Sequence, residues 1–313
     1  MNRLRLKSRP ERHSGPACFV VAVAIDSRYI VGDPSGNEKP GIFMRKELSA
    51  LIVERLRRDT SALRAAFARP AGVQTRFAVV DDVLPSEIAG KIYAAFPQVS
   101  EMRLLSSFRE RKYTSKSLET MDPLIAEATF AFQSPEVIAE VTSITRIRDM
   151  VGDPQLYAGG ISAMTKGHFL NPHIDNSHDG ARRYYRTLNL LYYVTPDWRP
   201  EYGGNLELWD QDVKQRVTVP SLFNRLVVME TTPRSWHSVS PVAHEGTRCC
   251  VSNYYFSDNS PEGYPYSHVT SFSARPEQPL RRGLARVDGA LRNALRHVFR
   301  KGLGKTDVYT PKS

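Results

Sequence analysis

The sequence predicts an α+β protein in which helices come first and a β-rich half follows. Between Met44 and Ile144, apolar residues recur every three to four positions over long stretches, which is the period of helices that bury one face. After Gly152 the pattern changes to short apolar runs separated by Gly, Pro, Asn and Asp, as expected for strands and their turns. The 313 residues, 41% of them apolar, can bury a large core, and this order of elements favours a C-terminal β-sandwich or barrel.

Three helical stretches and one strand are expected in the N-terminal half. Proline ends the first two stretches, and Ser86 is expected to cap the second at its start. The helical stretches cover about 44–69, 86–96 and 123–144, and the strand covers Phe77–Val80. Runs rich in apolar and β-branched residues predict five further strands in the C-terminal half. They lie near Tyr157–Lys166, Tyr185–Val194, Gly204–Asp210, Arg225–Glu230 and Arg248–Ser257.

Composition divides the chain into three parts. Residues 1–43 form a poorly defined basic segment, residues 44–272 form the folded domain with a β-rich core at about 152–258, and residues 273–313 form a basic tail. The net charge of +10 comes from the two ends, since residues 273–313 alone contain ten basic and three acidic residues. The middle of the chain is nearly neutral, so specific binding to nucleic acid is not expected.

The tail contains a predicted amphipathic helix from Leu280 to Lys301. Its leucine, valine and phenylalanine residues form one stripe, and arginines surround that stripe. The simpler interpretation is that the apolar stripe packs on the folded domain. The alternative is a peripheral contact with an anionic membrane surface or a protein partner. The sequence does not indicate an oligomeric state.

The cysteines and the apolar runs indicate the compartment. No run approaches the roughly 18 apolar residues of a transmembrane helix. Three cysteines, two of them adjacent, cannot form a disulfide framework, so a reducing compartment is expected, and we predict a cytoplasmic protein. The apolar run Ala17–Ile25 superficially resembles a signal peptide. A short strand, or a true translation start at Met44, would explain it equally.

Two histidines and an aspartate form the strongest candidate site. His173 and Asp175 are two residues apart, so on a strand both side chains face the same side and can reach one metal ion. His237, on a distant strand, would complete a set of two histidines and one carboxylate. Such a set leaves coordination positions open and suits non-haem Fe(II) and oxygen activation. Taken alone, the first pair would also fit a surface turn.

Arg248 is a candidate anchor for a carboxylate. It follows His237 by eleven residues and begins a β-rich run, in which strand alternation places Arg248, Cys250, Ser252 and Tyr254 on one face. A buried arginine there would offer a bidentate fork to a carboxylate. The alternative is an arginine in a surface salt bridge.

Six segments carry a recognisable pattern, and in chain order they are Tyr157–Gly160, Gly167–Asn176, Leu188–Trp198, Tyr202–Leu208, Trp236–Val242 and Gly246–Arg248. Together with the opening strand and helix at Phe77–Phe96, they resemble the 2-oxoglutarate/Fe(II) oxygenase superfamily, in its prolyl 4-hydroxylase-like branch. The resemblance covers about residues 77–257. It implies a double-stranded β-helix core of the jelly-roll or cupin-like type, with N-terminal supporting helices and the C-terminal amphipathic helix added to it.

The resemblance also implies a role for each candidate residue. His173, Asp175 and His237 would be the iron ligands, and Arg248 would pair with the distal carboxylate of 2-oxoglutarate. The implied reaction consumes O₂ and 2-oxoglutarate, releases succinate and CO₂ and hydroxylates an unactivated C–H bond, with ascorbate as the expected reductant. Halogenating relatives lack the carboxylate of Asp175, so hydroxylation is expected.

Three further positions differ from or extend the pattern. Ser252 matches a position where relatives often have a hydroxyl beside the distal carboxylate. Relatives commonly have a tyrosine where this chain has Met164, so another donor must contact the cosubstrate. Asn189 is the candidate, although a sheet-pairing or turn role fits it equally. Arg248 itself replaces the lysine of collagen-type prolyl hydroxylases.

The substrate is left open as a small molecule or a peptidyl residue. The charged segment Ser106–Ser117 is a candidate pocket gate, with a solvated loop as the simpler interpretation. A nucleic-acid demethylase of the superfamily would have a second arginine where Tyr254 stands. The alternative function is a non-catalytic metal-binding β-barrel that acts as a sensor or interaction module through its basic tails.

Overall fold

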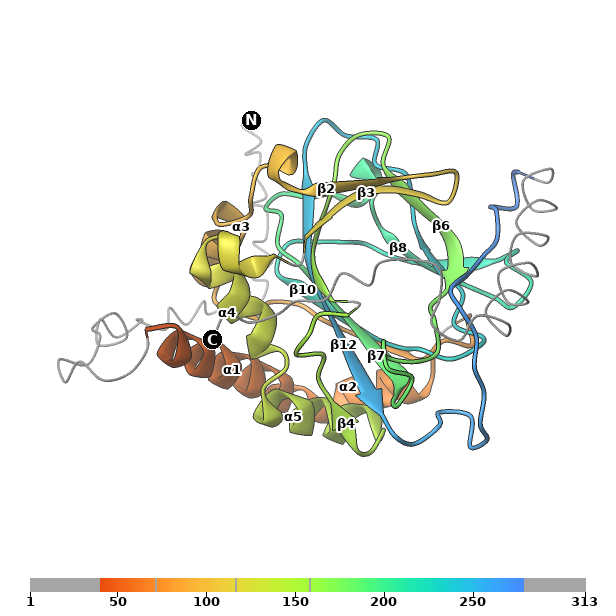
Figure 1. Cartoon of the computed structure of the whole chain (residues 1–313), viewed down its shortest axis with the longest axis horizontal. Helices are drawn as coiled ribbons and strands as arrows, with labels where there is room; N and C mark the ends of the chain where they lie inside the picture. The colour runs from red at the N-terminus through yellow and green to blue at the C-terminus, as the bar shows by residue number, and fades with distance from the viewer. Residues whose placement is uncertain (1–39, 71, 116, 158, 279–313) are drawn as a thin grey trace, which may run out of the picture. The chain divides into compact units, whose positions relative to one another are not determined.

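The computed structural model describes residues 40–70, 72–115, 117–157 and 159–278, which contain a curled antiparallel sheet and the helices packed on it (Figure 1). The predicted helix at Leu280–Lys301 and nearly all of the N-terminal basic segment lie outside these residues. No helix in the described ranges is long and apolar enough to cross a membrane.

The helices lie in the first half of the described chain, as the sequence predicts. They are α1 (Pro40–Arg58), α2 (Thr60–Ala68), α3 (Ser86–Ala94), α4 (Pro123–Ala131) and α5 (Pro135–Thr145), with short 3₁₀ turns at Val99–Glu101, Leu118–Thr120 and Pro200–Tyr202. The first and third predicted stretches each divide into two helices. In the third, the Ser134 hydroxyl accepts a hydrogen bond from the Val137 N–H at 3.3 Å and Pro135 takes the first helical position, so a new helix begins there. The prediction that Ser86 caps α3 is wrong, because Ser86 is its first residue and follows Pro85.

The strands form one continuous ladder in which every described pairing is antiparallel. They are β1 (Phe77–Val80), β2 (Arg103–Ser106), β3 (Glu110–Ser115), β4 (Met150–Val151), β5 (Gly160–Met164), β6 (Phe169–Ile174), β7 (Tyr185–Tyr193), β8 (Leu206–Trp209), β9 (Arg216–Val219), β10 (Arg225–Glu230), β11 (His237–Val239), β12 (Arg248–Ser257) and β13 (Ser271–Phe272). The predicted strands β1, β10 and β12 have the expected bounds.

The sheet curls so that its two halves face each other. One half has the order β1-β10-β7-β12-β5 and the other has the order β6-β11-β8-β9. β3 pairs with both β5 and β6 and links the halves. Tyr193 and Cys250 from the first half pack against Leu206 and Leu208 from the second, so apolar side chains fill the space between them. This curled arrangement is the double-stranded β-helix that the sequence predicts.

Strand alternation gives the first half two different faces. On β7, Leu188, Leu190 and Tyr192 point outward into the main core, where the helices pack on them through residues such as Ile52 and Phe132. The intervening residues of β7 point the other way, toward the second half. We call this second surface of β5, β7 and β12 the inner face. It carries the polar side chains from which the candidate site is built.

Candidate metal centre

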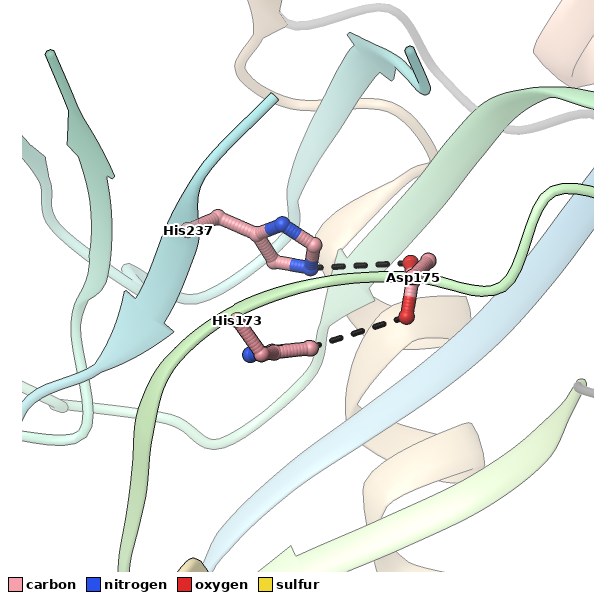
Figure 2. A group of neighbouring side chains, drawn as sticks. All are labelled: His173, Asp175 and His237. Carbon is pink, nitrogen blue, oxygen red and sulfur yellow. Dashed lines mark ion pairs between the residues drawn. The ribbon is translucent and has the colours of Figure 1, made fainter. Parts of the chain in front are cut away.

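The structure brings His173, Asp175 and His237 together at the end of β6. His173 is on β6, Asp175 follows that strand directly, and His237 begins β11. The two histidines are register partners, so their rings lie side by side with centroids 4.1 Å apart. Each histidine Nε2 is 3.6 Å from an oxygen of Asp175, as Figure 2 shows. One ligand atom from each residue lies within 4.8 Å of the others, so a single metal ion fits among them.

Backbone carbonyls orient both imidazole rings. His173 Nδ1 is 3.0 Å from the carbonyl oxygen of Asn171, and His237 Nδ1 is 2.9 Å from that of Ser235. Because a carbonyl oxygen can only accept, each Nδ1 must carry the hydrogen and donate it. Each Nε2 then presents its lone pair toward Asp175. Such second partners commonly fix the rings of metal-binding histidines.

Buried donors hold the carboxylate of Asp175. Its Oδ2 accepts a hydrogen bond from Asn189 Nδ2 at 2.7 Å and lies 3.1 Å from Arg186 Nη1. The other face of Asn189 is held as well, since its Oδ1 accepts from the Thr231 hydroxyl at 3.1 Å. His268 Nε2 donates to the backbone carbonyl of Asp175 at 2.8 Å. Oδ2 is therefore fixed by protein donors, and Oδ1 faces His173.

The surroundings set the charge of the three residues. Burial alone would raise the pKa of Asp175, but Arg186, His237 and His173 together hold this pKa well below its usual range. Burial, with His173 beside it, lowers the pKa of His237 to about 4. Near neutral pH the aspartate is therefore ionised and His237 is neutral. These are the forms that bind a divalent metal.

Arg248 lies on the inner face and is 3% exposed. Its guanidinium is 5.1 Å from the ring centroid of Tyr193, and its Nη2 is 2.9 Å from the thioether sulfur of Met164. Its Nε is buried without a hydrogen-bond partner, and no carboxylate among the described residues forms an ion pair with it. A buried cation in this state suits an anionic ligand.

Comparison with known proteins agrees with this geometry. Residues 159–256 match the family model described as the 2OG-Fe(II) oxygenase superfamily. The matched segment runs from just before β5 to Phe256 in β12 and contains His173, Asp175, His237 and Arg248.

Individual relatives match over limited lengths. Over 77 residues the chain is 35% identical to the Mus musculus protein named prolyl 3-hydroxylase OGFOD1, a match that covers 23% of this chain and 14% of the mouse protein. A prolyl-4-hydroxylase structure from Pseudomonas putida has a TM-score of 0.47 at 15% identity and covers 62% of this chain and 98% of its own. One from Phytophthora capsici has a TM-score of 0.47 at 17% identity and covers 81% and 80%.

Ser252 and Asn189 lie on the same inner face as Arg248. Ser252 is half-buried, with its hydroxyl 3.7 Å from the thiol of Cys250. Asn189 is the register partner of Tyr254, further along the same two strands. Its closest polar contact is Asp175, which makes it a partner of a candidate metal ligand. A contact of either residue with a cosubstrate remains a prediction.

Arg186 is a residue of the candidate site that sequence reasoning missed. It precedes Asn189 by three positions, so regular alternation would place the two side chains on opposite faces. The register between β7 and β12 shifts, because Leu188 pairs with Tyr255 but Arg186 pairs with Phe256. The extra residue, Thr187, forms a bulge that brings Arg186 to the face of Asn189. A charged residue within an apolar strand is the one signal that could have identified it.

Within the charged segment Ser106–Ser117, residues 106–115 are not the loop that the simpler interpretation expects. They contribute to the hairpin of β2 and β3, and the tip of this hairpin is anchored on β6. A role of the segment as a pocket gate remains a prediction. Asn171 donates its side-chain amide to the carbonyl of Phe108 at 2.9 Å and its backbone N–H to that of Arg109 at 2.9 Å. The segment is therefore part of the sheet next to the strand of His173.

Proposed function

We propose that the protein is an Fe(II)- and 2-oxoglutarate-dependent dioxygenase that hydroxylates an unactivated C–H bond. The observation that carries this proposal is that two candidate binding sites, one for a metal ion and one for an anion, adjoin the inner face. Three buried side chains that could hold one metal ion lie next to the inner face, where Asn189 of β7 contacts Asp175. Arg248 is buried on that face and forms no ion pair with a carboxylate of the described residues. A cosubstrate with a metal-chelating end and a distal carboxylate satisfies both.

The three donors fit iron in chemistry as well as in position. His173, His237 and Asp175 supply two imidazole nitrogens and one carboxylate oxygen, the donor set of non-haem Fe(II) oxygenases, and leave coordination positions open. When bound, Fe(II) with 2-oxoglutarate and O₂ supplies the oxidising chemistry, with succinate and CO₂ as co-products. Ascorbate is the reductant that we propose to keep the metal ferrous.

The neighbouring side chains and carbonyls orient the three residues that would hold the metal. Asn189 and Arg186 hold Oδ2 of Asp175, which faces Nε2 of His237 at 3.6 Å, and Oδ1 faces Nε2 of His173 at the same distance. The carbonyls of Asn171 and Ser235 orient the two imidazole rings so that each Nε2 faces Asp175. The three ligands are only 5%, 8% and 5% exposed, so the ligand geometry is set before any metal binds.

We propose that 2-oxoglutarate binds on the inner face. Arg248 would form a bidentate pair with the distal carboxylate, and Ser252, two strand positions beyond Cys250, would add a hydroxyl. Asn189 donates one amide hydrogen to Asp175, and its second amide hydrogen is available in principle for the cosubstrate. We therefore keep the predicted cosubstrate contact of Asn189 as a second role beside its bond to Asp175.

A prolyl residue of a peptide is the substrate that we propose first, with a small molecule as the alternative. The name of the mouse relative, prolyl 3-hydroxylase, supports this choice. The reducing cytoplasm remains our proposal for the location, and Cys249 and Cys250 are both free thiols. A contact of the C-terminal helix with an anionic membrane or a partner remains a prediction for residues outside the described ranges.

Succinate release measured with Fe(II), 2-oxoglutarate, ascorbate and prolyl peptides tests the activity. The parent protein should form succinate in step with O₂ uptake, and the His173→Ala variant should form none above background. If the parent binds iron and 2-oxoglutarate but forms no succinate even without a peptide, a non-catalytic metal-binding sensor is the better account. The charge of Arg248, which pairs with no carboxylate in the described part of the chain, favours the enzyme.

A further inference from the structure

Lys112 on β3 shares the inner face with Arg248. Register pairing connects Thr114 to Ser162 on β5, Ser162 to Cys250 on β12, and Cys250 to Tyr193 on β7. Side chains of paired residues point to the same face, so this row belongs to the inner face. Lys112 precedes Thr114 by two residues and therefore points to that face too.

Lys112 and Arg248 lie at the same end of the inner face. Along β12, Arg248 precedes Cys250 by two residues and is the register partner of Met164 on β5. Along β3, the step from Thr114 to Lys112 goes in the same direction as the step from Ser162 to Met164, because β3 and β5 are antiparallel. Lys112, Met164 and Arg248 therefore come from successive strands at one level of the sheet.

The charge of Lys112 acts on the buried groups of this face. Burial raises the pKa of the Cys250 thiol, whereas Arg248 and Lys112 both act to lower it. The lysine is not deeply buried: its side chain is 23% exposed, and its Nζ lies 3.1 Å from Oε2 of Glu110, which is 24% exposed. An ammonium at this partly exposed position can therefore turn toward an anion bound on the inner face.

Met164 lies between Lys112 and Arg248, and its side chain has no hydrogen-bond donor. Its thioether accepts weakly from Arg248 but has no hydrogen to donate to a carboxylate. A carboxylate offers about four acceptor positions, and the fork of one arginine occupies only part of them. The next strand, β3, offers Lys112 as a donor on a long flexible stem.

We propose that Lys112 binds the distal carboxylate of 2-oxoglutarate together with Arg248. This inference rests on the proposed function and adds a second cation to the cosubstrate site. Lys112 supplies the donor that Met164 cannot supply. Glu110 holds the ammonium while the site is free of cosubstrate.

The neighbouring Arg111 provides a matched control. It is also basic and also on β3, but alternation points it to the opposite face, where it is exposed and its charge acts on His168. Arg111→Gln therefore removes the same net charge from the same strand without touching the inner face. A general electrostatic effect would change cosubstrate affinity equally in the Lys112 and Arg111 variants.

Calorimetric titration of 2-oxoglutarate into metal-loaded protein under anaerobic conditions tests the inference. Lys112→Gln should weaken binding about fivefold or more, as expected for loss of a partly exposed charge pair. Arg111→Gln should bind like the parent, and Lys112→Arg should recover most of the affinity. With 2-oxopentanoate, which lacks the distal carboxylate, Lys112→Gln and the parent should bind alike. Retained metal binding confirms that each variant is folded.

Two results would overturn the inference. One is a Lys112→Gln variant that binds 2-oxoglutarate as tightly as the parent, or no more weakly than Arg111→Gln. The other is an equal loss with 2-oxopentanoate, which would mean that Lys112 acts elsewhere than on the distal carboxylate. If the parent itself does not bind 2-oxoglutarate, the proposed function fails as well, so the two failures are distinguishable.

Discussion

The guanidinium of Arg248 is buried on the inner face, where a charge is costly unless it is paired. Its two contacts, an aromatic ring and a thioether, do not neutralise it. The local sequence leaves room for this side chain, because Gly204 lies against it at a positive φ of 68°. The structure therefore maintains a positively charged position at a considerable energetic cost, which is understandable if an anion binds there.

Arg248→Ala should retain the metal and weaken 2-oxoglutarate binding. Truncating one member of a desolvated charge pair costs roughly 2–5 kcal/mol, which corresponds to about thirty-fold or more in affinity. Arg248→Lys should recover part of the loss, because lysine keeps the charge but not the fork. Anaerobic calorimetry measures both. Unchanged affinity in Arg248→Ala would show that the cosubstrate is anchored elsewhere.

Asn189→Ala should weaken metal binding by about tenfold or more, because partners of metal ligands typically contribute that much. Its amide fixes Oδ2 of Asp175 at 2.7 Å. Asn253→Ala is the control: this asparagine is buried in β12 and contacts Gln133 at 2.8 Å, away from the metal. Competition with a chromophoric chelator gives both affinities. Equal losses in the two variants would mean that Asn189 only stabilises the sheet.

At the scale of the element, the loop before β8 is shaped by two adjacent glycines. Gly203 and Gly204 both have positive φ, and a Cβ on Gly204 would lie 2.9 Å from Cδ of Arg248. A Cβ on Gly203 would lie 2.0 Å from the carbonyl oxygen of Pro241. The glycines therefore allow this loop to pack directly on the arginine and on the segment after β11.

Gly204→Ala should destabilise the protein and lower 2-oxoglutarate affinity together. Gly167→Ala separates the two causes, because Gly167 also has a positive φ, but a Cβ added to it would meet no other atom within 4 Å. Gly167→Ala should lose roughly 1–2 kcal/mol from backbone strain alone and bind the cosubstrate normally. Urea unfolding and calorimetry provide the two readouts. Normal binding by Gly204→Ala would mean that this loop does not position Arg248.

The elements also show what the sequence can and cannot predict. β1, β10 and β12 follow from their apolar runs. The spacing of His173 and Asp175 predicts that the two side chains lie together, and they do, although Asp175 follows β6 and is not part of it. β3 does not, because its charged sequence lacks the apolar alternation on which strand prediction depends. The role of Arg186 depends on a bulge in β7, and a one-residue change of register leaves no mark in hydrophobic periodicity. The formation of β3 and the position of Arg186 both depend on contacts between strands that are distant in the sequence.

At the scale of the whole molecule, several buried histidines favour the neutral form. Burial is the first cause of the lowered pKa of His168, His237 and His268. Their pKa values in the unfolded chain are close to 6.5, so below about pH 6.5 the unfolded protein binds more protons than the folded protein does. Their stabilising effect is complete above that pH and is lost as the pH falls toward the folded values.

The metal-free protein should therefore lose stability between pH 7 and pH 5. Urea unfolding at both pH values should show a lower free energy of unfolding at pH 5. His168→Gln should reduce this difference, because one of the contributing groups is removed while a polar side chain remains beside Thr165. A free energy of unfolding that is unchanged, or higher, at pH 5 would contradict the assignment of neutral buried histidines.

We expect the chain to bind Fe(II) through His173, Asp175 and His237 and to bind 2-oxoglutarate on that iron. The most direct test is the anaerobic addition of 2-oxoglutarate to iron-loaded protein, followed by visible absorption spectroscopy. The account predicts one iron per chain and a charge-transfer band that saturates at one cosubstrate per iron, with neither in His173→Ala or His237→Ala. Full iron occupancy in both variants, or no band with the parent protein, would contradict it.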